Sequence, residues 1–298
     1  MAKFASITQK ERAASQAATV MKSVQGNEIK SVGTVRNYEQ ALTRVAEHSL
    51  ANNQSLKEMT SERAINYLEQ RSEMVGQSTL NMERQAIQCM MQHVTNKLEQ
   101  NERLPVVQSE RQQALESRAY TKTQVDLISQ AQSERNAIST EIAHAAGLRA
   151  HELYTILPTA EQTPSERPAS DAKFSGRDGV SYTVDGKGGL IREVNIPRAL
   201  SERLENTRLS EARTITDRGV NYTQHYNING GNRWSASFSY NSNQQLGWSA
   251  GGHGVRHSYA QERMIELTKS GLTRSEALEV VSQEMGHFRP EITEVYLR

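Results

Sequence analysis

Between residues 28 and 104, apolar side chains recur every three or four positions, which is the spacing of one face of a helix. The three series are Val35, Tyr38, Leu42 and Val45; Ile65 and Leu68; and Ile87, Met90, Met91, Val94 and Leu98. The pattern predicts a small helical domain over residues 28–104. Residues 1–27 are rich in Ala, Ser, Gln and Lys with little apolar periodicity, so they are predicted to form a flexible N-terminal tail.

A polar stretch rich in Gln, Glu and Arg covers residues 105–120 and is typical of a linker. A second domain is then expected over residues 121–298. Thr121 and Gln124 form a capping-box pattern, in which each side chain satisfies a backbone donor at a helix start. This domain is therefore expected to open with a helix, and a further helix should end at Gly147, whose missing Cβ suits a tight junction.

Alternating apolar and polar residues follow in two short stretches, 180–184 and 190–196, on either side of the sequence D-G-K-G-G. Alternation is the pattern of a half-buried strand, and a glycine-rich turn between two strands indicates a hairpin. Lys187 is predicted at the tip of this hairpin. Together with the helical patterns, the hairpin predicts a chain that is mainly α with a small sheet, and an α+β second domain.

Two helices are predicted near the carboxyl end of the chain. Tyr259, Met264 and Leu267 are spaced to pack the first helix against a core. The second begins with a capping box at residues 273–276, and Gly286 can end it in a left-handed conformation. His287 would then lie directly at the end of that helix.

Composition narrows the class of protein. The 298 residues carry a net charge of +1, so any attraction to DNA must come from local placement of Lys and Arg. The one cysteine, Cys89, excludes an internal disulfide and a cysteine cluster for zinc, and its apolar neighbours indicate a core thiol. No stretch resembles a signal peptide or approaches the ~20 apolar residues of a membrane span, so we expect a cytoplasmic protein without a membrane partner.

Candidate chemistry is concentrated in residues 251–298. His253 and Arg256 are three positions apart and share one helix face, and Tyr296 follows His287 by nine residues. Two alternatives have weaker support. His253 and His257 have the spacing of a zinc pair, but a metalloprotease needs Glu after the first histidine and the chain has Gly. The G-K-G sequence at 186–188 lacks the spacing of a phosphate-binding P-loop.

These residues resemble the signature of the tyrosine recombinases, the phage-integrase family. The likeness rests on H-G-V-R-H at 253–257, M-G-H at 285–287 and the tyrosine nine residues later. The family also uses an arginine in G-L-R-x-x-E-L, which is G-L-R-A-H-E-L at 147–153 here, and a lysine in a G-K-G hairpin, as at 186–188. All six expected positions are filled in the expected order. The stretch from Gly247 through 264 is also similar to integrases of bacterial mobile elements.

The resemblance implies a catalytic set of Arg149, Lys187, His253, Arg256, His287 and Tyr296. Tyr296 would attack a DNA phosphodiester to give a 3′-phosphotyrosyl intermediate, with His253 as general base and Lys187 protonating the departing 5′ oxygen. The two arginines and His287 would stabilise the crowded phosphorus. Glu152 and His257 are expected to contact the catalytic residues and hold them in position, without contacting the DNA themselves. No metal ion, ATP or other cofactor is required for this chemistry.

The resemblance also implies an architecture and partners. A helical N-terminal core-binding domain and the catalytic domain would form a C-shaped clamp on double-stranded DNA that carries specific recombination sites. The candidate phosphate contacts in the N-terminal domain are Arg36, Lys57, Arg63, Arg71, Arg84 and Lys97. A tetramer on two DNA sites is expected, with an accessory DNA-bending or directionality factor as a further candidate partner, and the DNA-bound protein would associate with the nucleoid. Only two residues follow Tyr296, so either coupling between subunits uses another surface, with residues 205–250 as the candidate, or the coupling is weak.

Two other functions remain open at this point. A type IB topoisomerase uses a similar set of residues but relaxes supercoils, and a DNA-binding regulator could keep the fold without cutting. The helical N-terminal unit and the complete pattern favour recombination over relaxation. The intact set of six residues argues against a regulator that does not cleave.

Overall fold

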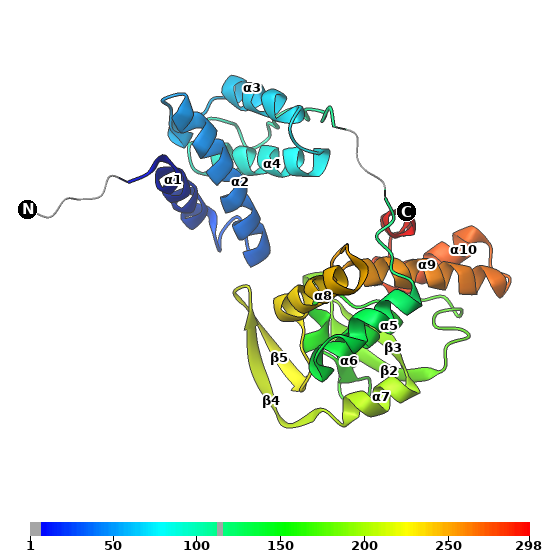
Figure 1. Cartoon of the computed structure of the whole chain (residues 1–298). Coiled ribbons are helices and arrows are strands. Elements are labelled where there is room, and N and C mark those ends of the chain that lie inside the picture. Colours follow the sequence, from blue (N-terminus) through cyan, green and yellow to red (C-terminus); the bar gives the residue numbers. More distant parts are fainter. Residues whose placement is uncertain (1–6, 112–115) are drawn as a thin grey trace, which may run out of the picture. The chain divides into compact units, whose positions relative to one another are not determined.

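The computed structural model describes residues 7–111 and 116–298, which belong to two compact units, residues 1–114 and 115–298 (Figure 1). The first unit is helical. Its elements are α1 (Gln9–Val24), α2 (Val32–Ala51), a 3₁₀ turn (Leu56–Glu58), α3 (Ser61–Ser72) and α4 (Gln77–His93). Within the described ranges, no helix has both the length and the apolar character needed to cross a membrane.

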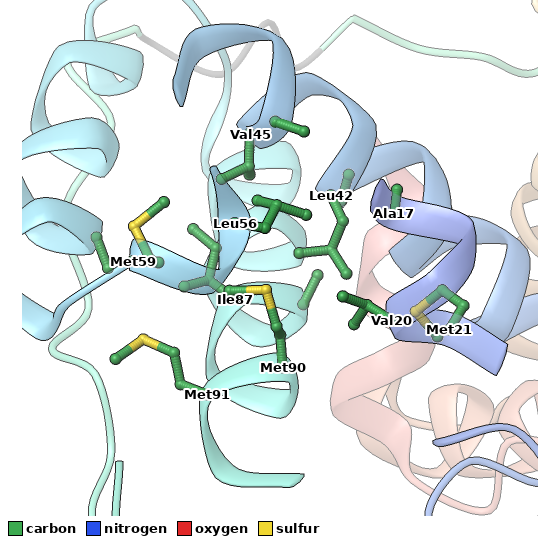
Figure 2. Packing of buried hydrophobic residues seen from close by; sticks show 14 of the residues in the cluster. Ala17, Val20, Met21, Leu42, Val45, Leu56, Met59, Ile87, Met90 and Met91 are labelled. Carbon is green, nitrogen blue, oxygen red and sulfur yellow. The ribbon is translucent and has the colours of Figure 1, made fainter. Parts of the chain in front are cut away.

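The predicted flexible tail, expected at most as a frayed helix, is wrong for residues 9–24, because they form helix α1, which packs into the core of the first unit. Its N-terminus is closed by a capping box between Thr8 and Glu11. Ala13, Ala17 and Val20 are buried in the core of the first unit, against α2 (Figure 2). The first two of the five buried positions of α1 are alanines, Ala13 and Ala17, which bury little area each, so the apolar signal of the first half of the helix is weak. Residues 1–6 lie outside the described part of the chain.

The core of the first unit is formed by the apolar series that the sequence displays. Leu42 and Val45 of α2 face Ile87 and Met90 of α4, as Figure 2 shows. Cys89 is half-buried against this core, and burial raises the pKa of its thiol. Both ends of the predicted linker are packed within the units. Val107 lies against the first core, and Tyr120 is buried in the second unit.

The second unit combines helices with two small antiparallel sheets, as the α+β prediction requires. Its elements are α5 (Lys122–Gln130), α6 (Glu134–Ala146), a 3₁₀ turn (Glu152–Tyr154), β1 (Leu157–Pro158), β2 (Gly179–Asp185), β3 (Ile191–Pro197), α7 (Arg198–Glu205), β4 (Arg208–Asp217), β5 (Val220–Tyr226), α8 (Gly231–Leu246), α9 (Gly254–Lys269), α10 (Arg274–Glu284), α11 (Pro290–Thr293) and a last 3₁₀ turn (Glu294–Leu297). The capping boxes predicted at Thr121 and Thr273 are both present.

Strands β2 and β3 form the predicted hairpin, with β1 on the outer edge of β2. The register pairs Asp185 with Ile191, so the G-K-G sequence occupies the turn. Strands β4 and β5 form a separate two-stranded ribbon that the sequence pattern does not predict (Figure 1). Most side chains of β4 are exposed or half-exposed on both faces, so the strand lacks a buried face and its sequence lacks the alternation that would reveal it.

Two apolar clusters hold the second unit together. One surrounds α6 and the hairpin and contains Ile142, Val184 and Val194. The other lies between α9 and α10 and contains Leu267 and Val281, with Tyr296 packed against its edge. The turn after α6, the end of α10 and the last turn of the chain are therefore fixed to buried structure.

Candidate active site

Arg149 is held in the turn that follows α6. The helix ends at Gly147, whose φ of 59° is left-handed, and a Cβ there would lie 2.8 Å from the ring of Tyr259. Three residues after Arg149, Glu152 opens a 3₁₀ turn. One carboxylate oxygen, Oε1, accepts from Arg149 Nη1 at 2.6 Å, and Oε2 accepts from the Arg149 backbone N–H at 2.7 Å. Glu152 therefore fixes both the backbone and the guanidinium of Arg149.

Glu152 is fully buried and surrounded by three guanidinium groups. Besides Arg149, it accepts from Arg192 Nη2 at 2.7 Å, and Arg256 Nη1 lies 3.9 Å from Oε2. Burial alone would raise the pKa of this carboxyl, but Arg192, Arg256 and Arg149 outweigh it and lower the pKa well below its usual range. The carboxylate is therefore ionised at neutral pH.

Arg256, on the first turn of α9, is fully buried. Nη1 donates to the backbone oxygen of Gly147, and Nη2 donates to the backbone oxygen of Met285 at 3.2 Å. Its Nε is buried and has no hydrogen-bond partner in the described structure. Burial and the charge of Arg149 lower the pKa of Arg256 to about 10, which leaves it charged at pH 7. The Nε–H of the buried Arg256 guanidinium is therefore an unused hydrogen-bond donor.

His287 lies beside Arg256, in the position that the sequence predicts at the end of α10. Gly286 has a φ of 72° and reverses the chain there. The ring Nε2 lies 3.2 Å from Arg256 Nη2, and Nδ1 lies 3.0 Å from Thr293 Oγ1. Because a guanidinium can only donate, Nε2 accepts and the ring proton is assigned to Nδ1. Burial and Arg256 lower the pKa of His287 to about 3, so the ring is neutral at pH 7.

Tyr296, in the last 3₁₀ turn, has its ring at the centre of this group. The ring centroid lies 4.8 Å from that of His257, 5.1 Å from that of His287 and 5.5 Å from that of His253. The guanidinium carbon of Arg256 is 5.6 Å from the same centroid. Residues separated by as many as 43 positions in the sequence therefore meet around one phenol ring.

His253 and His257 are also neutral at pH 7. His257 is buried, and burial and the Arg118 charge lower its pKa to about 4. Packing of the His253 ring and the charge of Arg256 lower the pKa of His253 to about 4 as well. Part of the His253 side chain is exposed, so water weakens these effects there. A neutral imidazole at the accessible rim of the site can accept a proton.

Lys187 lies at the tip of the β2–β3 hairpin and is exposed. Lys187 and His287 line the same cavity, of about 560 Å³, together with Gly286 and Phe288. Among the described residues, no hydrogen bond or ion pair joins Lys187 to another member of the site. The structure therefore brings five of the predicted catalytic residues into one cluster and leaves Lys187 on the wall of the adjoining cavity.

Arg192, on β3, is a member of the cluster that the sequence analysis missed. Its side chain is 2% exposed and bonds Glu152, as described above. A signal was present, because Arg192, Val194 and Ile196 alternate along the strand and all three are buried. A charged residue at an inward position of a strand indicates a buried partner.

The candidate DNA contacts of the first unit have different environments. Arg71 donates to the buried carboxylate of Glu83 at 3.0 and 3.1 Å, so it has a role within the fold, and its phosphate contact stays a prediction. Three others donate to backbone oxygens: Arg63 to Glu58, Arg84 to Leu104, and Lys97 to Lys57. Lys57 is exposed and Arg36 is half-exposed.

Several solved structures share the fold. XerH site-specific recombinase bound to difH substrate is 14% identical over 99% of this chain and 94% of that chain, with a TM-score of 0.54. The Tn1549 transposon integrase in complex with transposon right end DNA is 14% identical over 96% and 94%, with a TM-score of 0.55. A lambda integrase dimer bound to a COC′ core site is 12% identical over 95% and 76%, with a TM-score of 0.61.

These matches confirm the resemblance at the level of the fold, which is that of the tyrosine recombinases. No protein-family model matches the chain, and no curated protein sequence matches it.

Proposed function

We propose that the chain is a site-specific DNA recombinase that cuts and rejoins DNA strands through a covalent link to Tyr296. The observation that carries the proposal is the position of the Tyr296 ring, among three neutral histidines and the buried, charged Arg256. A phenol beside an unused guanidinium donor has both the nucleophile and the charge that a phosphodiester requires. The shared fold agrees with the proposal without establishing it.

The proposed first step transfers a phosphoryl group and balances without a co-reactant. The Tyr296 phenol oxygen attacks phosphorus and forms a P–O bond, and the bond between phosphorus and the 5′ oxygen breaks. His253 takes the phenol proton, because its ring is neutral at pH 7 and its centroid lies 5.5 Å from that of Tyr296. Lys187 delivers a proton to the departing 5′ oxygen. In the second step a 5′ hydroxyl from another strand attacks the phosphotyrosine, so the energy of the ester bond is conserved.

The two arginines stabilise the charge that develops on the non-bridging oxygens. Arg256 Nε is the free donor, and Arg149 is oriented by Glu152. Each such donor commonly contributes about 2.7–4 kcal/mol to the transition state. In the unbound arrangement His287 Nε2 accepts from Arg256, so its predicted role as a donor requires the ring proton to shift to Nε2 when phosphate engages Arg256.

The proposed partner is double-stranded DNA with specific recombination sites. In this proposal the first unit, residues 1–114, is the core-binding domain, which contacts the DNA backbone through residues such as Arg36 and Lys57. The active assembly is a tetramer on two sites, and an accessory DNA-bending or directionality factor could assist it. Such an assembly would act in the cytoplasm, on the nucleoid.

Covalent capture tests the proposal. The protein is incubated with a library of nicked duplexes of randomised sequence, denatured in detergent, and the DNA that stays attached is sequenced. The expected result is an enriched sequence that also supports strand exchange between two duplexes. Tyr296→Phe should bind this duplex and give no adduct, whereas the matched control Tyr259→Phe, which removes a hydroxyl bonded to Glu284, should still give it.

Other outcomes distinguish the remaining functions. Relaxation of supercoiled plasmid without strand exchange would favour a topoisomerase. Sequence-specific binding by folded wild-type protein with no adduct would favour a regulator and contradict the proposal.

A further inference from the structure

The buried guanidinium of Arg192 connects two segments that carry site residues. Nη1 donates to the backbone oxygen of Glu284 at 2.6 Å, in the last turn of α10 before His287. Nη2 donates to the backbone oxygen of Gly147 at 3.2 Å and to Glu152 Oε2 at 2.7 Å, on the turn that carries Arg149. Among the described residues, Arg192 forms no hydrogen bond or ion pair with Tyr296 or Arg256.

Arg192 also competes with Arg256 for one carboxylate oxygen. Glu152 Oε2 already accepts from Arg192 Nη2 and from the backbone N–H of Arg149, both at 2.7 Å. Arg256 Nη1 lies 3.9 Å from the same oxygen and is not hydrogen-bonded to it. The carboxylate is therefore saturated by its other partners, and the Arg256 charge is left without a hydrogen-bonded counter-ion.

We propose that Arg192 is a positioning residue that prevents Glu152 from neutralising Arg256, and so directs the Arg256 charge to the scissile phosphate. The inference rests on the proposed function, since it concerns the same phosphate site. Without Arg192, Glu152 would be a buried carboxylate with an empty acceptor, and the nearest free cation is Arg256. Closing the 3.9 Å gap to a hydrogen bond would pair the two groups and move the Arg256 donors away from the phosphate.

Gly286 makes room for this arrangement. A Cβ at this position would lie 2.7 Å from Arg192 Cδ, and the φ of 72° disfavours any other residue. Gly286, which turns the chain toward His287, therefore also leaves the space that the Arg192 side chain occupies. Gly286→Ala offers a second way to displace Arg192 while keeping its charge.

The test compares cleavage of two substrates by the full-length protein. Both carry the duplex sequence obtained by covalent capture. One has the normal phosphodiester at the cleavage position, and the other has a methylphosphonate, in which a methyl group replaces one non-bridging oxygen and removes its negative charge. Arg192→Gln should slow cleavage of the phosphodiester about a hundredfold, the scale expected for misplaced groups, and slow the methylphosphonate much less. Duplex affinity should stay near the wild-type value.

Two further variants and a control make the result decisive. Gly286→Ala should reproduce the selective loss of phosphodiester cleavage. Arg192→Lys should cleave faster than Arg192→Gln, because the lysine ammonium can still pair with the Glu152 carboxylate. Arg263→Lys is the matched control, since Arg263 is equally buried and bonds Glu284 but not Glu152. It should slow both substrates equally, if at all.

If Arg192→Gln slows cleavage of both substrates equally, Arg192 only stabilises the fold and the inference is overturned. If the glutamine variant does not fold, the same equal loss in Arg192→Lys and Gly286→Ala would overturn it. The same selectivity in Arg263→Lys would also overturn it. If the folded wild-type protein forms no adduct with the captured duplex, the proposed function itself fails, which is a separate and recognisable result.

Discussion

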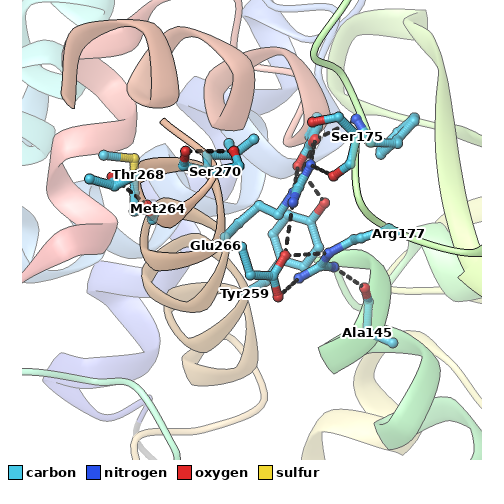
Figure 3. A network of polar contacts seen from close by, with 12 residues as sticks. Ala145, Ser175, Arg177, Tyr259, Met264, Glu266, Thr268 and Ser270 are labelled. Carbon is cyan, nitrogen blue, oxygen red and sulfur yellow. Dashed lines mark hydrogen bonds and ion pairs between the residues drawn. The ribbon is translucent and has the colours of Figure 1, made fainter. Parts of the chain in front are cut away.

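Two clusters of arginine and glutamate lie in the second unit, each around one fully buried carboxylate, and they differ in charge balance. In the first, Arg263 donates to Glu284 at 3.0 Å and to Glu266 at 2.8 Å. Arg177 donates to Glu266 at 3.0 Å, as Figure 3 shows. Two guanidinium groups thus face two carboxylates. Tyr259 completes the set by donating to Glu284 at 2.8 Å.

The cluster around Glu152 has three guanidinium groups, those of Arg149, Arg192 and Arg256, and one carboxylate. A buried charge without a partner is costly, so a fold selected for stability alone would be expected to resemble the Glu284 cluster. The surplus at Glu152 lies beside the Tyr296 ring, where an entering phosphodiester would supply the missing negative charge. The contrast therefore separates a cluster that holds the fold from one prepared for an anionic substrate.

The largest effect is expected from removing the surplus donors. Arg256→Lys keeps a charge but loses the fork and the free Nε, so cleavage of the captured duplex should fall by about 10²–10³-fold. Arg149→Ala should cause a loss of the same order. Single-turnover adduct formation measures both effects, and a near-normal rate in a folded variant would remove that arginine from the mechanism. Arg177→Lys, in the balanced cluster, serves as the control and should cleave normally.

The balanced cluster should respond in stability and leave cleavage unchanged. Glu284→Gln removes the buried carboxylate that pairs with Arg263 and leaves only Glu266, whose side chain is 45% exposed, so the unfolding free energy of the second unit should fall by about 3 kcal/mol. Both tryptophans, Trp234 and Trp248, lie in this unit, so their fluorescence in a urea titration reports on it alone. If Glu284→Gln leaves stability unchanged, or if the folded variant loses cleavage, the Glu284 cluster does not serve stability alone and the distinction between the two clusters fails.

Stability should also depend on pH through the neutral histidines of the site. The folded pKa values of His257 and His287, about 4 and about 3, lie below the ordinary value of about 6.5. As pH falls below 6.5, the unfolded chain binds protons that the folded chain does not, so stability is full above pH 6.5 and decreases toward pH 4. The slope should be at most about 1.4 kcal/mol per pH unit for each histidine.

The same tryptophan signal, followed in urea at several pH values, measures this slope. His257→Gln should flatten it, whereas His48→Gln, in the first unit, should not. A profile that stays flat between pH 6.5 and 4.5 would mean that these rings are not buried in neutral form.

The smallest effect is expected from chelation. The proposed chemistry uses guanidinium groups where other phosphoryl-transfer enzymes use metal ions. EDTA should therefore leave adduct formation unchanged, measured on the captured duplex in the same assay. Strong inhibition that added Mg²⁺ or Zn²⁺ reverses would contradict this mechanism.

The features that the sequence predicts are those with a local signal. The hairpin around Lys187 follows from strict alternation, and the helix end before His287 follows from a glycine that must be left-handed. Helix α1 is missed because the apolar signal of its first half rests on two alanines, Ala13 and Ala17. The β4–β5 ribbon is missed because β4 has no buried position and one of the two buried residues of β5, Gln224, is polar.

The predicted site shows the same division. The motif positions identify residues such as Arg149 and Tyr296, but not their partners in space. Arg192 is 40 residues from Glu152 in the sequence and donates a hydrogen bond to it. In the sequence, only its inward position on β3 indicates a buried partner. The charge surplus depends on distances between four side chains from three segments, the turn after α6, β3 and α9, so no single stretch of sequence contains it.

The identity of the residue joined to DNA tests the central claim most directly. The trapped complex of wild-type protein and captured duplex is digested with nuclease and protease, and the remaining peptide is sequenced by tandem mass spectrometry. A nucleotide 3′-phosphate esterified to the Tyr296 oxygen is the predicted result. Attachment to any other side chain, or its absence in a folded sample that binds the duplex, would contradict the account.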